Sequence, residues 1–283
     1  MQVATIRTED GLRAARRDGE ELVLLPFDDV GALLASGAGW AARAAATEGT
    51  RVPVAGADYA SLVPMPEKVF CVGLNYADHA EEAGLPIPEY PPLFAKFGRS
   101  LIGAHDDLAI PAASDKVDWE VELGVVIGKP ARHVSEADAE DFVGGYTVVN
   151  DVSMRDWQLR TSQFLQGKAF EASTPVGPYL ITPDEVDHAR SLAMELVVDG
   201  EVKQRTNSDQ MIFSVAQVIS YISTFITLAP GDLIATGTAS GVGHLASPPV
   251  YLTPGSRMTC SIEGLGSQTT RCVAATDGAT AAA

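Results

Sequence analysis

The sequence predicts an α+β protein that is predominantly β, with a small N-terminal domain ahead of a larger one. Short apolar segments of strand length recur along the chain, and residues 118–127 alternate between two faces with the period of a strand. A chain of 283 residues is also long enough for one large and one small domain. The predicted division is an α/β domain over residues 1–65, the larger domain over 66–275, and a disordered tail over 276–283.

The composition of the chain argues against some classes of binding partner and indicates a cellular compartment. The formal net charge is −17 and no Lys/Arg cluster is present, which argues against nucleic acid. Residues 211–228 are apolar for about a membrane thickness, but Ser214, Gln217 and Thr224 interrupt them and the apolar positions repeat on one helix face, so we expect a core helix and no membrane. Three cysteines without metal-type spacing and no signal pattern predict a reduced, cytoplasmic protein.

The sequence of the N-terminal domain predicts secondary structure but contains no cluster of candidate catalytic or metal-binding residues. Residues 21–25 form a strand candidate, and a helix begins near Asp28 with acidic residues at its start. An Ala-rich run follows over residues 40–46. Prolines then punctuate the chain before a predicted strand over residues 68–73.

The strand over residues 68–73 leads to a candidate proton-handling pair. If the chain turns helical after Asn75, His79 and Glu82 are at i and i+3 and can touch. Glu82 could then take a proton from water while His79 orients or shares it. The alternative is an ordinary surface contact. The proline-rich residues 84–92 are either a surface loop or a stiff lid that excludes water.

Two predicted strands bring three carboxylates toward one place. In the strand over residues 118–127, Glu120 and Glu122 share a face, and a second strand over residues 145–150 runs directly into Asp151. Buried together, each close pair would repel by up to roughly 4 kcal/mol unless a cation lies among them. All-oxygen ligands favour magnesium, manganese or calcium. A wet acidic strand face is the alternative.

Further polar residues follow the carboxylates. Residues 152–160 are compatible with a helix capped by Ser153, and Gln158 lies about two turns beyond Asp151. Lys168 lies among apolar neighbours, so it either extends to solvent or supplies a fixed positive charge for an anionic substrate.

The C-terminal part contains a hairpin and a glycine-rich loop. Residues 194–203 form a predicted hairpin with Asp-Gly at its turn. Residues 236–243 follow a short strand but lack the Gly-Lys-Ser/Thr ending of a phosphate loop. The loop is either a simple turn or a source of hydrogen-bond donors, including the Thr238 hydroxyl, for an oxygen-rich ligand.

The ordered set of motifs resembles the fumarylacetoacetate hydrolase family from about residue 68 to residue 273. The matching pieces are Val72-Gly73-Leu74-Asn75-Tyr76 with His79 and Glu82, Glu120-Val121-Glu122, Asn150-Asp151 with Arg155-Asp156 and Gln158, Gly167-Lys168, and Pro230-Gly231-Asp232 before Thr236-Gly237-Thr238. Ala239 departs from the pattern, which usually has proline there. The first 65 residues are not covered.

The resemblance implies a mixed, mostly β roll-like catalytic domain and a homodimer. It implies that Mg²⁺, or Mn²⁺ or Ca²⁺ in its place, is held by Glu120, Glu122 and Asp151. It further implies that His79 and Glu82 form a water-activating pair and that Lys168 supplies a catalytic charge. The substrate would be a small anionic 2-oxo acid, bound by Tyr76, Gln158 and Thr238.

Residues and resemblance together predict a metal-dependent hydrolase that cleaves the carbon–carbon bond of an acylpyruvate-type (2,4-dioxo acid) substrate, as in the catabolism of aromatic compounds. The alternatives are an oxaloacetate decarboxylase, or an isomerase or tautomerase of an unsaturated 2-oxo diacid. A non-catalytic calcium-binding protein would explain the carboxylates and the charge. It would not explain Lys168 or the His79–Glu82 pair.

Overall fold

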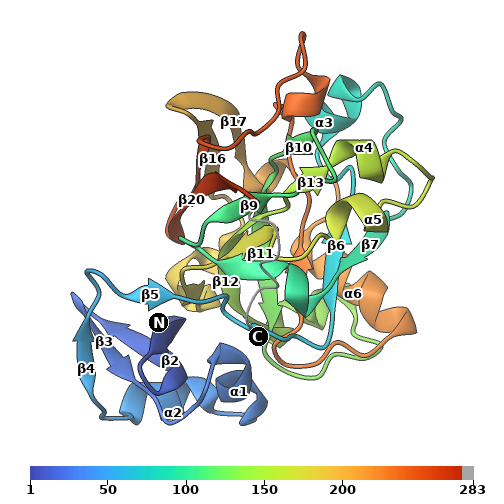
Figure 1. Cartoon of the computed structure of the whole chain (residues 1–283). Helices are drawn as coiled ribbons and strands as arrows, with labels where there is room; N and C mark the ends of the chain where they lie inside the picture. Colours follow the sequence, from blue (N-terminus) through green and yellow to red (C-terminus); the bar gives the residue numbers. More distant parts are fainter. Residues whose placement is uncertain (276–283) are drawn as a thin grey trace.

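Two large β-sheets form most of the protein in its computed structural model, with short helices around them (Figure 1). The structure describes residues 1–275, so the predicted tail over residues 276–283 lies outside the described residues. The mixed, predominantly β architecture confirms the predicted fold class.

The larger sheet contains 13 strands and runs through both parts of the chain. Its main order is β4 (Arg51–Pro53), β3 (Glu21–Leu24), β2 (Gly11–Asp18), β1 (Gln2–Thr8), β15 (Leu180–Ile181), β12 (Val143–Asn150), β11 (Val121–Ile127), β18 (Leu233–Ala235), β6 (Val69–Val72) and β7 (Leu93–Lys96). Three short strands pair off this path: β5 (Asp58–Tyr59), β8 (Leu101–Gly103) and β14 (Thr174–Val176).

The smaller sheet packs over β11 and β12. Its order is β17 (Glu201–Asn207), β16 (Ala193–Val198), β19 (Arg257–Ile262), β20 (Gly266–Ala274) and β9 (Leu108–Ile110). The predicted hairpin is confirmed as β16 and β17, where Asp199 and Gly200 both have positive φ, as a tight two-residue turn requires. A two-stranded ribbon pairs β10 (Val117–Asp118) with β13 (Ser153–Met154).

Strand β11 lies near the middle of the larger sheet and is buried on both faces. It pairs with β12 from Val121 to Ile127 and with β18 on its other side. Its apolar face, including Leu123 and Val125, joins the core that the smaller sheet covers. The opposite face carries Glu122 and is buried too, so the alternative of a wet acidic strand face is wrong.

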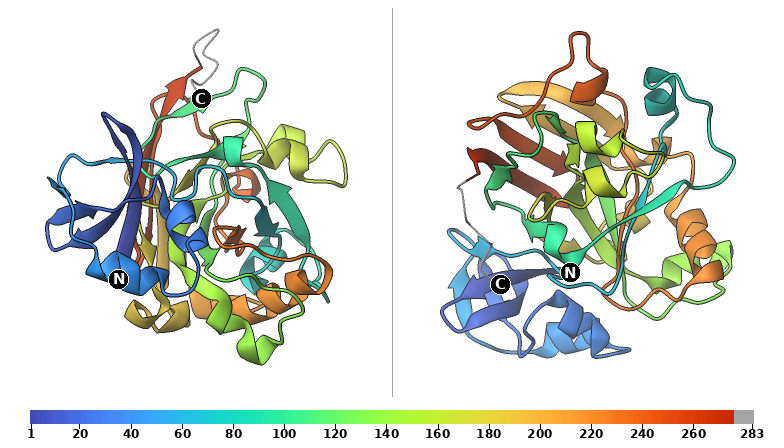
Figure 2. Two further views of the ribbon diagram at one scale, coloured as in Figure 1. Left: turned by 90° about the horizontal axis from the view of Figure 1, so that it is seen from below. Right: turned by 45° about the vertical axis from the view of Figure 1, so that its right-hand side comes forward.

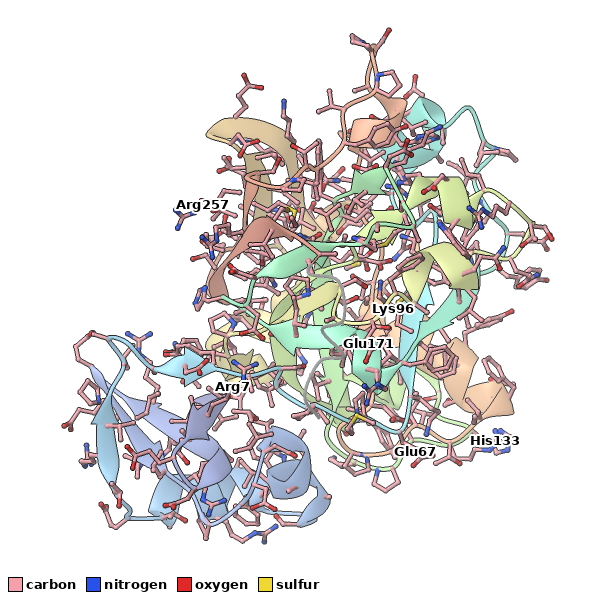
Figure 3. All side chains as sticks on the ribbon, viewed as in Figure 1. Arg7, Glu67, Lys96, His133, Glu171 and Arg257 are labelled. Carbon is pink, nitrogen blue, oxygen red and sulfur yellow. The ribbon has the colours of Figure 1, made fainter. Side chains whose placement is uncertain are left out.

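The N-terminal residues form a lobe at the lower left of Figure 1 and on the left of both views in Figure 2, but they share a sheet and a core with the rest. Strand β1 pairs with β15, and apolar residues of the lobe join the same cluster as Val126 and Leu233. Arg7 lies at the junction (Figure 3), where it forms ion pairs with Asp58 and Asp106. A domain boundary near residue 65 stays a prediction.

Within residues 1–275, six short α-helices complete the fold, and none of the helices there is both long and apolar enough to cross a membrane. They are α1 (Val30–Ala35), α2 (Trp40–Ala46), α3 (Ala77–Glu82), α4 (Arg155–Gln158), α5 (Leu165–Lys168) and α6 (Val215–Phe225). Ser214 caps α6 with a capping box, which confirms the core helix. The expected cap at Ser153 is wrong, because Ser153 lies in β13 and its hydroxyl donates to the Asp151 carbonyl.

Candidate active site

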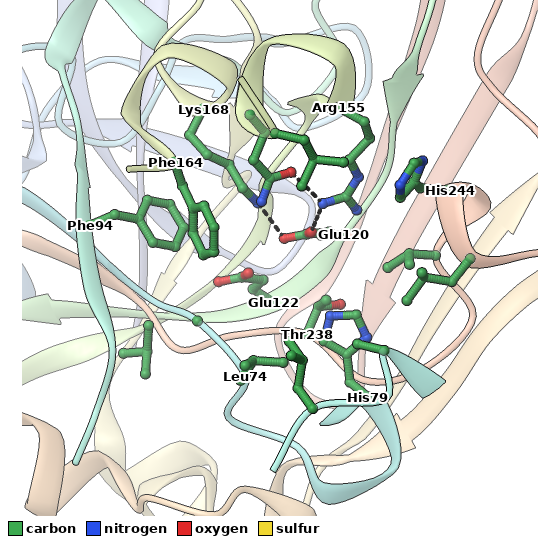
Figure 4. A pocket seen from close by; sticks show the side chains of 18 residues that line it. Leu74, His79, Phe94, Glu120, Glu122, Arg155, Phe164, Lys168, Thr238 and His244 are labelled. Carbon is green, nitrogen blue, oxygen red and sulfur yellow. Dashed lines mark hydrogen bonds and ion pairs between the residues drawn. The ribbon is translucent and has the colours of Figure 1, made fainter. Parts of the chain in front are cut away.

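A cavity of about 240 Å³ lies between helices α3, α4 and α5 and the loop after β18 (Figure 4). The buried side chains of Glu120, Glu122 and Lys168 form its base, and apolar side chains make up much of the remaining lining. The lining residues are Val72, Gly73, Leu74, His79, Ala83, Leu85, Phe94, Glu120, Glu122, Arg155, Gln158, Leu159, Phe164, Lys168, Thr238, Val242, His244 and Leu245.

Three carboxylates meet at this cavity because β11 and β12 are antiparallel neighbours. Glu120 immediately precedes β11, and the pairing of Val121 with Asn150 brings Asp151 beside it. The Asp151 amide donates to the Glu120 carbonyl over 2.9 Å. Glu122 is on the same strand face, and one oxygen from each of the three carboxylates lies within 4.8 Å of the others. The predicted carboxylate trio is therefore assembled and buried.

Three buried cations surround two of the carboxylates. The Lys168 ammonium bridges Glu120 and Asp151 at 2.7 and 2.8 Å. Arg155 reaches the other oxygen of Glu120 at 2.8 Å. Lys96 reaches the other oxygen of Asp151 and is buried; its label in Figure 3 lies near the central strands. Lys168 therefore does not extend to solvent.

The pKa values reflect this unequal pairing. Burial alone would raise the pKa of Glu120, but the charges of Lys168 and Arg155 outweigh it and lower that pKa to about 2. Glu122 has no ion-pair partner among the described residues and accepts a hydrogen bond only from the Gly237 amide, at 2.9 Å. Its burial, with Asp151 and Glu120 beside it, raises its pKa well above the usual range.

The donor set fits a divalent cation. The trio offers carboxylate oxygens alone, which are the ligands that Mg²⁺, Mn²⁺ and Ca²⁺ prefer. Glu122 is the carboxylate whose negative charge the protein leaves without a partner cation, so an ion held by the trio would remove the repulsion that it experiences. Glu120, Glu122 and Asp151 are the residues that would hold it.

Helix α3 places the proton-handling pair at another side of the cavity. His79 Nδ1 lies 3.1 Å from Glu82 Oε2, and the other Glu82 oxygen accepts the Gly241 amide at 2.9 Å. His79 lines the cavity, whereas Glu82 does not. The imidazole therefore stands between the cavity and Glu82. Beyond α3, residues 84–92 form neither helix nor strand, and Leu85 lines the cavity.

The three predicted substrate contacts have different positions. Gln158 lines the cavity, and its side-chain oxygen accepts from Arg155. Thr238 lines it too, but its hydroxyl donates to the Val121 carbonyl and accepts from Gln204, so it is not free to donate to a ligand. Tyr76 is not brought to the cavity: its side chain is buried and its hydroxyl points to the Met194 sulfur at 3.6 Å.

Three polar residues near the cavity were not predicted as site residues. Lys96 ends the strand β7, where alternation alone gives no sign of a carboxylate partner 55 positions away. Arg155 was part of a matching motif, and its spacing of four residues from Asp151 was the available signal. His244 follows the glycine-rich loop and has no sequence signal of its own.

Comparison with known proteins gives a consistent result. A family model described as fumarylacetoacetate (FAA) hydrolase C-terminal matches residues 68–273. A mitochondrial oxaloacetate tautomerase of Homo sapiens is 44% identical over 228 residues, which cover 80% of this chain and 73% of the relative.

Two solved structures are similar over most of the chain. Fumarylacetoacetate hydrolase from Exiguobacterium antarcticum has a TM-score of 0.86 and 29% identity, and the match covers 97% of this chain and all of that one. Fumarylpyruvate hydrolase from Pseudomonas aeruginosa, in complex with Mn²⁺ and pyruvate, has a TM-score of 0.68 and 39% identity, with 74% of this chain and 91% of that one covered.

Proposed function

The chain belongs to the fumarylacetoacetate hydrolase family, and on that premise we propose that it is a divalent-metal-dependent enzyme that acts on a 2-oxo acid through its enol form. The leading activity is keto–enol tautomerisation of a short 2-oxo diacid of the oxaloacetate type. The observation that carries this proposal is the Lys168 ammonium, buried and held 2.7 Å from Glu120 and 2.8 Å from Asp151 at the base of the cavity.

A 2-oxo acid and its enolate are anions, and this protein has a net charge of −17. Binding therefore needs cations at one place, and the base of the cavity supplies them. A bound divalent cation would act as a Lewis acid toward the 2-oxo oxygen. Burial disfavours the Lys168 ammonium, yet Asp151 and Glu120 raise its pKa above the usual range, so the lysine stays charged and stabilises negative charge on the substrate.

Conversion of the enol to the keto form moves a proton from the oxygen on C2 to C3, while the C2–C3 double bond becomes the C2–O double bond. His79 lines the cavity and is held by Glu82, so its ring is the group placed to accept a proton and return one. Phe94 and Phe164 contact each other edge to face, and the Phe94 ring lies 5.1 Å from the Lys168 ammonium, so this part of the cavity lining is apolar. The similarity to an oxaloacetate tautomerase over 80% of this chain supports this reading.

Hydrolysis of an acylpyruvate is the second candidate. The hydrogen bond between His79 and Glu82 favours it, because the pair could deprotonate a water molecule that attacks the distal acyl carbonyl. The carbon–carbon bond would then break to give a carboxylic acid and the enolate of pyruvate, which takes up a proton. Similarity to a fumarylpyruvate hydrolase supports this candidate.

One assay series separates these activities. Protein loaded with Mg²⁺ or Mn²⁺ is mixed with the enol form of oxaloacetate, with fumarylpyruvate and with saturated acylpyruvates, and enol absorbance, pyruvate and carbon dioxide are followed together. We expect faster loss of the enol without release of pyruvate. Release of pyruvate from fumarylpyruvate or the saturated acylpyruvates, with no effect on the enol of oxaloacetate, would establish the hydrolase. Release of carbon dioxide from oxaloacetate would establish a decarboxylase. No metal-dependent turnover of any of them would contradict the proposal.

A further inference from the structure

One wall of the cavity carries polar groups that the proposed chemistry does not use. Arg155 and His244 both line this wall and lie near each other in Figure 4. Neither residue acts on the substrate in the proposed chemistry, although Arg155 pairs with Glu120 and donates to Gln158. The lining of the cavity also includes apolar side chains, among them Leu159 and Leu245.

Asp118 fixes the position of this pair. One of its carboxylate oxygens accepts from Arg155 Nε at 2.8 Å and from the His244 amide at 2.9 Å. The other oxygen accepts from the amides of Gly243 and Trp119, both at 2.8 Å. Because Asp118 is fully buried, the spacing between Arg155 and the His244 backbone is built into the fold.

Both side chains retain unused hydrogen-bonding capacity. Arg155 is 95% buried; its Nε and Nη1 are bonded to Asp118, Glu120 and Gln158, but its Nη2 has no partner among the described residues. The His244 Nδ1 lies 2.8 Å from the Tyr251 hydroxyl. Nε2 is then the ring nitrogen left for a ligand. A buried cationic N–H without a partner is unfavourable, which points to an acceptor supplied from outside the chain.

We propose that Arg155 and His244 form a subsite for the distal carboxylate of a 2-oxo diacid, with His244 as a specificity-determining residue. The inference rests on the proposed function, in which the carboxylate trio and Lys168 bind the 2-oxo acid end. Tyr251 positions the imidazole, and the His244 tautomer with a proton on Nε2 donates to the carboxylate. Arg155 supplies positive charge and the unpaired Nη2–H.

This subsite determines a substrate class. A substrate with an apolar tail would leave the Arg155 and His244 donors unpaired, whereas a diacid satisfies them. Sites built to hydrogen-bond a substrate group reject analogues that lack it more strongly than apolar walls reject a changed methylene. The protein should therefore prefer a 2-oxo diacid to a monoacid of the same length.

The test measures binding separately from turnover. Calorimetry with Mg²⁺-loaded protein compares 2-oxoglutarate with 2-oxopentanoate, which has the same chain length but no distal carboxylate. We expect the wild type to prefer the diacid, and H244L to weaken diacid binding at least roughly tenfold while monoacid binding is unchanged. H244Q keeps a donor and should restore most of the preference. Y251F should lose a smaller part of it. H105L, which changes an exposed histidine outside the cavity, is the matched control.

Kinetics with oxaloacetate and its 4-methyl ester complete the test. H244L should raise KM for oxaloacetate, with little change in kcat, and leave KM for the ester unchanged. Equal effects on diacid and monoacid, or no effect on either, would overturn the subsite. If no substrate is turned over but the wild type still prefers the diacid and H244L abolishes that preference, the subsite stands and the proposed function fails.

Discussion

Two sides of the cavity differ in how deeply their functional side chains are buried and in how many contacts hold them. On the side of α4 and α5, Lys168 and Arg155 are buried and each contacts carboxylates at 2.7–2.8 Å. On the side of α3, the His79 and Glu82 side chains are 13% and 23% exposed and form one mutual hydrogen bond of 3.1 Å. Only six residues form this helix, and the backbone bends away at Gly84 with a φ of 65°.

The difference separates two tasks. Buried ion pairs hold their geometry, because moving one partner leaves an unpaired charge in the interior. A six-residue helix has little stability of its own and depends on its contacts. We infer that the α4–α5 side provides the electrostatics that all chemistry on a 2-oxo acid needs, whereas the α3 side determines how protons move and which reaction follows.

The largest effect is expected from E122Q, which removes a predicted metal ligand that has no cationic partner. Turnover should fall by roughly a thousandfold, because Lewis-acid stabilisation contributes several kcal/mol. The free energy of unfolding of the metal-free protein should change little. In D151N, by contrast, Lys96 and Lys168 lose a buried partner, and the cost is about 3–5 kcal/mol. Denaturant unfolding and activity assays check both variants; full turnover by chelated wild type would contradict the metal requirement.

The next effect tests the α3 side. E82Q keeps size but cannot accept a proton, so acylpyruvate hydrolysis should fall roughly a hundredfold. Tautomerisation of oxaloacetate should fall less, since it needs no activated water. D78N, on the same helix, is the control, because Asp78 contacts Ser240 and does not line the cavity. If E82Q slowed hydrolysis and tautomerisation equally, the α3 side would not determine which reaction follows, and the proposed division between the two sides of the cavity would be wrong.

Lys168 gives a smaller but diagnostic effect. K168M should lower turnover at least about tenfold, because it removes a charge that stabilises the substrate anion. Its ammonium also contacts Glu120 and Asp151, so the metal affinity should stay the same or become tighter once this competitor is gone. Metal titrations and kinetics of the Mg²⁺-loaded variant measure the two quantities. Weaker metal binding with unchanged kcat would assign Lys168 to the metal site alone.

The smallest effect is expected at the end of α3. A Cβ at Gly84 would meet no atom within 4 Å, so G84A is penalised only by its left-handed backbone, by about 1–2 kcal/mol. Thermal unfolding should show a modestly lower midpoint, and turnover at low temperature should remain near that of the wild type. A loss of activity as large as that of E82Q would show that the loop after α3 takes part in the chemistry.

Local patterns predicted the parts of the site that one or two elements create. The two-residue period placed Glu120 and Glu122 on one face, and the strand that ends at Asn150 placed Asp151. The i and i+3 spacing likewise predicted the contact between His79 and Glu82. In each case the geometry of a single strand or helix was sufficient.

Residues joined by distant parts of the chain were not predictable in this way. Asp118 connects Arg155 to His244, and no local pattern links strand β10 with residues 126 positions later. Tyr76, assigned to substrate binding by the family resemblance, is buried away from the cavity with its hydroxyl toward the Met194 sulfur. Thr238 is in the expected place, but hydrogen bonds to Val121 and Gln204 already use its hydroxyl.

The central position of β11 in the sheet determines how rarely this strand unfolds. Its amides pair with β12 along the strand and with β18 across Gly124–Val126, and every residue of the strand is buried. Amide hydrogens in such a strand exchange with solvent only when most of the molecule unfolds. Those of α3 should exchange through frequent local opening. The spacing of Glu120 and Glu122 would then survive fluctuations in which the His79–Glu82 pair repeatedly separates and reforms.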